Sequence, residues 1–208
     1  MNKKKTIPAA TVNRLPMYLR YLKELAQKGD TVISSYDLAE LAGGNGPQLR
    51  KDLSYLGELG TRGVGYDVES LIHQISEFMG LNKEQSVAII GAGKLGTALF
   101  GYEGFAEKGF KICAIFDTDL QKVDQKINGL FISDIKDLER IVGEKKIEIC
   151  IITTPASEAQ KVADKAVSSG INAILNFAPV SLKMPDRVVV RQIDLSIELQ
   201  ILSFYKAL

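Results

Sequence analysis

The sequence predicts an α/β protein in which a helical N-terminal part precedes a doubly wound parallel sheet. Three observations indicate this class. Apolar residues recur at helical spacing up to about residue 80. Beyond that point short apolar runs alternate with helical segments, and a glycine-rich loop follows the first run. The 208 residues suffice for one large or two small domains, and a hydrophobic content of 46% suffices for a buried core.

Four leucines define the first predicted helix. Leu15, Leu19, Leu22 and Leu25 recur at steps of four, three and three, which places them on one face of a helix. Residues 67–80 form another predicted helix, which connects the N-terminal part to the sheet. The single histidine, His73, lies in this connecting helix, and we interpret it as structural.

Two short helices separated by glycines are typical of a helix-turn-helix. Ser34, with Asp37 three residues later, resembles a capping box that opens the first of them. Gly43-Gly44 ends that helix, and the next begins near Pro47, since proline is tolerated in a first helical turn. Residues 61–66 are rich in glycine and are a candidate hairpin tip.

Five apolar runs are the predicted strands of the sheet. They are short and continuous, as is typical of parallel strands that are buried on both faces. Predicted helices at 94–108, 134–143 and 157–169 separate them. The runs are residues 87–90, 112–116, 147–152, 173–177 and 188–193.

The first strand leads directly into a GxGxxG loop at the start of a helix, a pattern that predicts dinucleotide binding. The first glycine permits a tight turn, the second lets a pyrophosphate approach the backbone, and the third allows close packing of helix on strand. The helix start offers unpaired N–H groups to the phosphates. The loop residues are Gly91, Ala92, Gly93, Lys94, Leu95 and Gly96.

An acidic residue at the end of the second strand supports this prediction. Asp117 lies 21 residues after Gly96, where a carboxylate accepts the adenosine ribose hydroxyls. A carboxylate would repel a 2′-phosphate, and no arginine follows closely, so NADH and NAD+ are favoured over their 2′-phosphorylated forms. The alternative is that Asp117 or Asp119 only caps a turn.

Loops after later strands are candidates for the nicotinamide end of the site, because ligands in such sheets lie outside the carboxyl ends of the strands. Proline and asparagine are also common in ordinary turns, which is the alternative interpretation. The candidate residues are Thr153, Pro155, Asn176, Phe177 and Ala178.

The sequence offers no evident catalytic machinery. Hydride transfer needs a proton donor or acceptor, and Tyr102 is the nearest candidate, although it would equally serve in packing. Cys113 and Cys150 lie in apolar runs without metal-ligand spacing, so no metal site is expected. We therefore predict a ligand-binding protein and not an enzyme.

The first 65 residues are basic, and the rest of the chain is slightly acidic. Ten basic and six acidic side chains precede residue 66, against 16 and 19 after it. A basic end predicts a polyanionic partner, and the second helix of the helix-turn-helix presents side chains suited to the grooves and phosphates of duplex DNA. An arginine at the hairpin tip would enter a narrow minor groove. The alternative is the solvated face of a small helical bundle. The candidate DNA-binding residues are Gln48, Arg50, Lys51, Ser54, Tyr55, Arg62 and Gly63.

Taken together, these motifs closely resemble the Rex family of redox-sensing transcriptional repressors. The resemblance runs from about Ile7 to Tyr205. Its longest motifs are LRKDLSYLGELGTRGVGY at 49–66, IGAGKLGTAL at 90–99, FDTD at 116–119, TTPASEAQKVAD at 153–164, AILNFAP at 173–179 and DLSIELQILSFY at 194–205.

The resemblance implies a winged-helix DNA-binding domain with its connecting helix at 1–80 and a Rossmann NAD(H)-binding domain at 81–192. It also implies a helix at 193–208 that swaps across a homodimer. The function implied is repression from palindromic operator DNA, with release when NADH binds and with NAD+ competing for the same site. The many apolar residues of the last helix agree, because a solvent-facing helix would carry fewer.

The family's switch pairs an arginine of the first helix with an aspartate before the last one, which correspond here to Arg20 and Asp194. Tyr102 corresponds to a tyrosine near the nicotinamide. We hypothesise that Arg20 and Asp194 pair in only one of the two states. One departure is the turn at residues 43–48, which is richer in glycine than we expect, so operator preference would differ slightly.

Three rival functions remain open from the sequence. They are a small dehydrogenase, a module that binds coenzyme A or another nucleotide, and a DNA-binding regulator that responds to a different nucleotide. No run approaches 18 apolar residues, and the N-terminal lysines precede no apolar stretch, so we expect a cytoplasmic protein without a membrane span.

Overall fold

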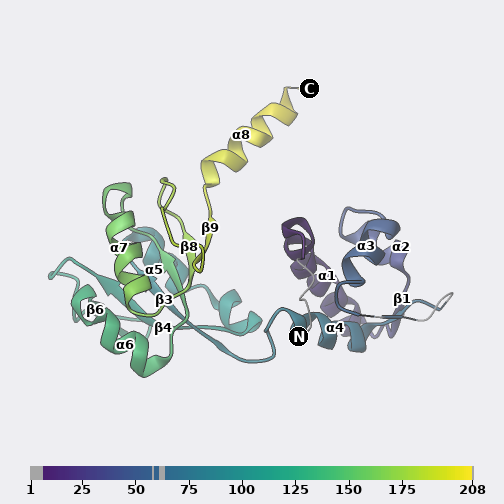
Figure 1. Cartoon of the computed structure of the whole chain (residues 1–208), viewed down its shortest axis with the longest axis horizontal. Helices are drawn as coiled ribbons and strands as arrows, with labels where there is room; N and C mark the ends of the chain where they lie inside the picture. Colours follow the sequence, from purple (N-terminus) through teal and green to yellow (C-terminus); the bar gives the residue numbers. More distant parts are fainter. Residues whose placement is uncertain (1–6, 58, 61–63, 208) are drawn as a thin grey trace. The chain divides into compact units, whose positions relative to one another are not determined.

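The computed structural model describes residues 7–57, 59–60 and 64–207. The chain divides into two compact units, Met1–Asn82 and Lys83–Leu208, each with its own hydrophobic core (Figure 1).

The described residues of the first unit form four helices and a small antiparallel sheet. Val32 pairs with Asp67 and Ile33 with Tyr66, so the two strands bring the chain back to the last helix of the unit. Helices with one small sheet are the parts of a winged helix, as the resemblance implies. The elements are α1 (Ala9–Lys28), β1 (Val32–Ile33), α2 (Ser35–Leu41), α3 (Gly46–Leu53), β2 (Tyr66–Asp67) and α4 (Val68–Phe78).

Side-chain caps set the starts of α2 and α3. The Ser34 hydroxyl accepts the N–H of Asp37 at 3.1 Å, which confirms the predicted cap. The Asn45 carbonyl oxygen accepts the N–H of Gln48 at 2.9 Å, with Pro47 in the first turn. Leucines form much of the core of this unit. Leu15, Leu19 and Leu22 have the predicted spacing, and Leu38, Leu49 and Leu53 pack with them.

The second unit is built on a seven-stranded sheet in the order β5-β6-β4-β3-β7-β8-β9. Its six parallel strands follow the order 3-2-1-4-5-6 along the chain, which is that of a Rossmann fold. An antiparallel strand, β5, pairs with β6 at the edge. The strands are β3 (Gln85–Ile90), β4 (Phe110–Asp117), β5 (Lys126–Ile127), β6 (Leu130–Asp134), β7 (Ile149–Ile152), β8 (Ala173–Asn176) and β9 (Val189–Gln192).

Alternate residues of β3 face opposite sides of this sheet and bury both of its faces. Ala88 and Ile90 belong to the cluster that includes α6 (Leu138–Lys145) and α7 (Ala156–Ser168). Val87 and Ile89 belong to the other cluster, which packs against the end of α5 (Lys94–Phe100). Burial on both sides explains why the strands are continuous apolar runs.

Two predicted helices differ from the structure, and two strands of the sheet, β5 and β6, were missed. The helix expected at 94–108 ends at Phe100, and a 3₁₀ segment, η1 (Glu103–Lys108), follows the break at Gly101. The helix expected at 134–143 begins only at Leu138, after a short 3₁₀ turn, and the residues before it form β6. β6 has only three consecutive apolar residues, Leu130, Phe131 and Ile132, and of these Ile132 alone is buried.

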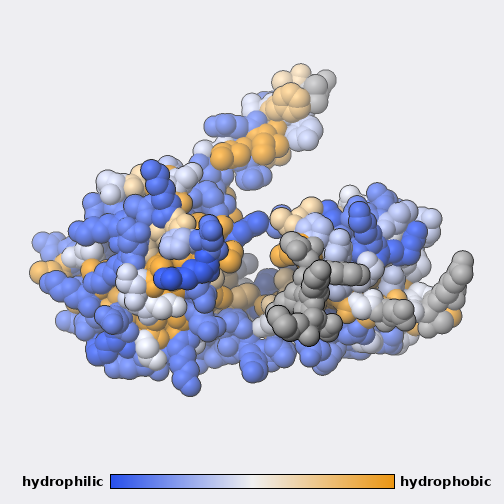
Figure 2. All heavy atoms as spheres, in the orientation of Figure 1, coloured by the Kyte–Doolittle hydropathy of each residue, from blue (hydrophilic) through white to orange (hydrophobic). Residues whose placement is uncertain are grey.

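The last helix, α8 (Leu195–Lys206), has no buried residue. Its large apolar side chains are between 45% and 67% exposed, and they form hydrophobic patches on the surface of the helix (Figure 2). These residues are Leu195, Ile197, Leu199, Ile201, Leu202, Phe204 and Tyr205. Within the described part of the chain, no helix combines the length and apolar character needed to cross a membrane.

Candidate functional site

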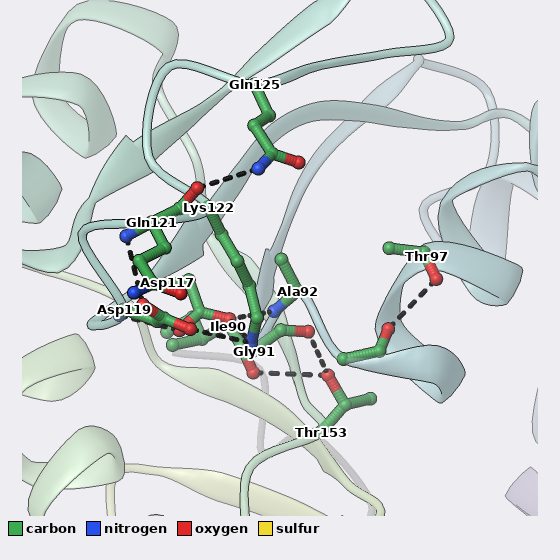
Figure 3. Close-up of polar contacts among 11 residues, drawn as sticks. Ile90, Gly91, Ala92, Thr97, Asp117, Asp119, Gln121, Lys122, Gln125 and Thr153 are labelled. Carbon is green, nitrogen blue, oxygen red and sulfur yellow. Dashed lines mark hydrogen bonds and ion pairs between the residues drawn. The ribbon is translucent and has the colours of Figure 1, made fainter.

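A cavity of about 620 Å³ opens where the central strands of the second unit end. β3, β4 and β7 lead into it from their carboxyl ends, which is where ligands bind in open parallel sheets. Its polar contacts are drawn in Figure 3. The lining residues are Ile90, Gly91, Gly93, Leu95, Asp117, Thr118, Asp119, Lys122, Ile135, Thr153, Thr154, Pro155, Glu158, Val162 and Phe177.

Each of the three glycines of the loop is a glycine for a different structural reason. Gly91 has a φ of +111°, and a Cβ there would come within 2.9 Å of the Thr153 backbone. A Cβ on Gly96 would collide with the carbonyl of Gly91, so this glycine permits the close packing of helix on strand. A Cβ on Gly93 would meet no atom within 4 Å and would project into open space, where a ligand can reach the backbone. The roles predicted for Gly91 and Gly96 are those that the structure shows, and the approach of a pyrophosphate at Gly93 stays a prediction.

Asp117 ends β4 beside this loop. Its Oδ2 accepts the N–H of Ala92 at 2.8 Å and a hydrogen bond from Lys122 Nζ at 3.0 Å, while its Oδ1 accepts the N–H of Asp119 at 2.9 Å (Figure 3). Burial alone would raise the pKa of Asp117, but the hydrogen bonds from Asp119, Lys122 and Ala92 outweigh it and lower the pKa. Asp117 is therefore an ionised carboxylate at neutral pH. Its hydrogen bonds hold the glycine loop at Ala92 and the turn after β4 at Asp119.

The loop after β7 contributes a second wall. Thr153 Oγ1 donates to the carbonyl of Gly91 at 2.8 Å, so this hydroxyl ties β7 to the glycine loop. Pro155 precedes α7 and lines the cavity. Thr154 was not among the predicted site residues. Its hydroxyl oxygen is buried, lines the cavity, and has no hydrogen-bond partner among the described residues.

The residues at the end of β8 divide between lining the cavity and supporting it. Phe177 lines the cavity. Asn176 is fully buried. Its side-chain Nδ2 donates to the side-chain Oε1 of Gln192 at 2.7 Å, and its Oδ1 accepts the N–H of Ala178 at 3.0 Å. Ala178 is also buried and is not among the lining residues. Asn176 therefore holds the loop that presents Phe177.

Lys94 and Tyr102 lie outside the cavity lining, whereas Leu95 belongs to it. Tyr102 is 55% exposed, and its ring meets that of Phe105 edge to face at 5.1 Å. A role for Tyr102 at the nicotinamide stays a prediction.

These features fit a dinucleotide. The open backbone at Gly93 can take a pyrophosphate, the Asp117 carboxylate can take ribose hydroxyls, and the Thr154 hydroxyl is a buried polar group that still needs a partner. Lys122 is a second lining residue that the sequence analysis did not identify, because only the turn after β4 brings it back to Asp117.

The predicted DNA-contacting residues of the first unit lie on α3 and just after it. Lys51 and Ser54 are exposed, and Tyr55 is half-buried. Arg50 donates to the Ser35 hydroxyl at 2.8 Å and lies over the ring of Tyr36. Arg62 and Gly63 lie outside the described residues.

The glycine-rich turn has a visible consequence for Arg50. A Cβ on Gly46 would come within 3.1 Å of the Arg50 guanidinium and 3.4 Å of the Tyr36 ring. The absence of a side chain at position 46 therefore leaves room for Arg50 to lie against α2.

A buried carboxylate that the sequence analysis missed holds α3 against α1. Asp52 is fully buried, and it accepts two hydrogen bonds from Arg14, at 2.6 and 2.8 Å. It accepts three more from Thr11, Tyr18 and Gln48, at 2.8, 2.9 and 3.0 Å. Burial alone would raise the pKa of Asp52, but these hydrogen bonds outweigh it and lower the pKa to about 2. Gln48, a predicted base-reading residue, is thus tied to the core of the unit.

The two proposed switch residues have local partners in their own units. Arg20 forms an ion pair with Glu24 at 3.5 Å and donates to the Tyr21 hydroxyl at 2.8 Å. Asp194 caps α8 by accepting the N–H of Ser196 at 2.9 Å. Hydrogen bonds from the Ser196 hydroxyl and from its N–H lower the pKa of the Asp194 carboxyl.

A helix-turn-helix unit joined to a Rossmann unit with a dinucleotide-type cavity defines a class of protein, the ligand-responsive DNA-binding regulators. Profiles of two families match the chain. One is described as "Putative DNA-binding protein N-terminus" and covers residues 6–54; the other is described as "CoA binding domain" and covers residues 82–180.

Relatives that match nearly the whole chain identify the family more specifically than these two profiles do. The redox-sensing transcriptional repressor Rex of Streptomyces griseus is 50% identical over 200 residues, which are 96% of this chain and 79% of that protein. Rex of Carboxydothermus hydrogenoformans is 48% identical over 95% of both chains. The chain belongs to the Rex family of redox-sensing transcriptional repressors.

Solved structures agree with this assignment. A crystal structure of RSP, a Rex-family repressor, matches with a TM-score of 0.89 and 37% identity over 97% of this chain and 94% of that one. RSP in complex with NAD+ and operator DNA matches with a TM-score of 0.91 and 38% identity over 97% of this chain and 93% of that one.

Proposed function

We propose that this chain is a redox-sensing transcriptional repressor that binds palindromic operator DNA as a homodimer and is released when NADH binds. NAD+ competes for the same site, so transcription follows the NADH/NAD+ ratio. The observation that carries the proposal is the cavity built by the GxGxxG loop and Asp117, in a chain whose other unit carries a helix-turn-helix. Relatives named as Rex, and RSP structures named with NADH and with NAD+ and operator DNA, support it.

In this proposal the second unit binds the dinucleotide. Residues 81–192 form the binding domain, with the pyrophosphate at Gly91, Ala92, Gly93 and neighbouring loop residues and the adenosine ribose on Asp117. Thr153, Pro155, Phe177 and Tyr102 belong to the nicotinamide side. Asn176 and Ala178 act by holding the loop around Phe177.

The preference for NADH follows from charge. The reduced nicotinamide is neutral and the oxidised ring is positive, and burying an uncompensated charge in an apolar environment costs free energy. Leu95 and Phe177 supply apolar surface to the cavity. NADH is therefore the tighter ligand, and equal affinities for NADH and NAD+ would contradict this explanation.

The first unit, residues 1–80, binds the operator through α3 and the segment that follows it. Lys51, Arg50 and Arg62 supply positive charge, while Gln48, Ser54, Tyr55 and the backbone of Gly63 complete the contacts. A twofold dimer suits a palindromic site, because each half-site meets the same surface. The C-terminal segment, residues 193–208, contains α8 and joins the two copies by swapping between them.

The relatives are named as repressors, and we infer that this chain likewise performs no catalysis and works in the cytoplasm. The dinucleotide is then a sensed ligand that is released unchanged. NADH oxidised at a steady rate by the protein and a small carbonyl compound would refute this part of the proposal.

The decisive experiment selects bound sequences from a random duplex library and elutes them with NADH. We expect an enriched palindrome that NADH releases and NADPH does not. No enrichment would refute DNA binding by this chain, and a palindrome that NADH fails to release would refute the sensed ligand. A variant with Asp117→Ala is the matched control, because its DNA should stay bound when NADH is added.

A further inference from the structure

Lys122 lies over the carboxylate that is expected to receive the ribose. Its Nζ is 3.0 Å from Asp117 Oδ2 and 3.9 Å from Asp119 Oδ2, and all three residues line the cavity (Figure 3). The Lys122 side chain is 38% exposed, so it can leave the carboxylate without opening the core.

The other donors to Asp117 are fixed. The N–H groups of Ala92 and Asp119 belong to the two turns that bound the cavity and occupy one acceptor position on each oxygen. An ionised carboxylate offers about four acceptor positions. Lys122 takes a third, the second one on Oδ2, so a ribose that uses both oxygens must compete with the ammonium group.

Charge around this position is otherwise negative. Of the described residues that line the cavity, Asp117, Asp119 and Glu158 are acidic and Lys122 alone is basic. A phosphate on the 2′ oxygen would meet the Asp117 carboxylate and would find Lys122 as its cation.

We propose that Lys122 is a specificity-determining residue of the dinucleotide site, which competes with ribose hydroxyls for Asp117 and pairs with a 2′-phosphate. This inference rests on the proposed NAD(H)-binding function. Lys122 weakens the binding of NADH and strengthens that of NADPH. It therefore reduces the preference for NADH over NADPH that Asp117 imposes. Neither effect requires a change of fold.

The test is two separate titrations of the full-length protein, one with NADH and one with NADPH, each followed by the fluorescence of the reduced nicotinamide. In Lys122→Met we expect NADH to bind about threefold to fivefold more tightly and NADPH about fivefold more weakly, the size of one partly exposed ion pair. Lys122→Gln, which keeps a polar side chain without charge, should move both affinities in the same directions.

Lys126→Met is the matched control, because Lys126 is a nearby lysine that does not line the cavity. Its NADH/NADPH affinity ratio should equal that of the wild type. An unchanged or smaller ratio in both Lys122 variants, with NADH still bound, overturns the inference alone. Failure of the wild type to bind either dinucleotide overturns the proposed function as well.

Discussion

Five hydrogen bonds to the Asp52 carboxylate hold the helix that carries the predicted DNA contacts. Asp52→Ala removes the acceptor of five hydrogen bonds and leaves Arg14, Thr11 and Tyr18 facing a void. The Thr11 and Tyr18 side chains are almost fully buried, so their hydroxyls lose a hydrogen-bond acceptor inside the core.

The expected loss of stability can be bounded in two ways. Removing one partner of a buried ion pair costs about 3–5 kcal/mol, and the Arg14 side chain is 32% exposed, so the lower end applies. Independently, a pKa lowered from 3.8 to about 2 corresponds to about 2–3 kcal/mol between the protonated and ionised forms. We therefore expect Asp52→Ala to lower the unfolding free energy of the first unit by about 3 kcal/mol.

The same pKa predicts a pH dependence. The folded-state pKa of Asp52 lies below its unfolded value, so its contribution is complete above about pH 4 and is lost as the pH falls towards 2. The Asp52→Ala variant should lack this part of the acid sensitivity of the wild type.

Urea unfolding followed by tyrosine fluorescence measures this loss. The chain has no tryptophan, and five of its seven tyrosines belong to the first unit. Tyr18→Phe, which removes one donor, should cost about 1 kcal/mol. Asp30→Ala, at an exposed aspartate of the same unit, should change the unfolding free energy by less than about 0.5 kcal/mol. A cost for Asp52→Ala as small as that of Asp30→Ala would refute the reasoning.

Three further predictions concern the ligand site, the DNA contacts and the dimer. Gly96→Ala should destabilise the second unit in thermal unfolding because its Cβ meets the Gly91 carbonyl, whereas Gly93→Ala should keep the wild-type melting temperature and weaken NADH binding in a titration; equal stabilities would refute this distinction. Lys51→Met should reduce the slope of log affinity against log salt by about one in operator titrations, and an unchanged slope would remove Lys51 from the phosphate contacts. Leu199→Glu on the exposed apolar surface of α8 should shift the protein from dimer to monomer in sedimentation, and an unaltered dimer would exclude this surface from the interface.

Local sequence patterns were sufficient where structure depends on local rules. The GxGxxG loop could be predicted because Gly91 and Gly96 answer steric demands of the backbone and Gly93 leaves the backbone open, and the cap at Ser34 because it is formed within one turn. The strands buried on both faces were visible as apolar runs. β6 was not, because its apolar run is only three residues long and is followed by Ser133 and Asp134.

Features that depend on long-range contacts were missed. Asp52 lies in a run of charged residues on α3 and resembles a solvent-facing side chain in the sequence. Its partner Arg14 is 38 residues away, so the ion pair exists only once α1 packs on α3. Lys122 and Thr154 are similar cases, since one depends on a turn and the other on an enclosed cavity.

The local partners of Arg20 and Asp194 constrain how the proposed switch can work. Arg20 is exposed and paired with Glu24, and the Asp194 carboxylate caps α8. An ion pair between Arg20 and Asp194 would therefore replace contacts that both residues already make. An exposed ion pair shifts an equilibrium by about fivefold at most. Moving a protein from 1:99 to 99:1 between two states requires a preference of about 10⁴-fold. The pair can therefore report the state but cannot impose it. The larger part of the preference must come from surface that is buried differently in the two states, and the seven exposed apolar residues of α8 are the largest such reserve on the described chain.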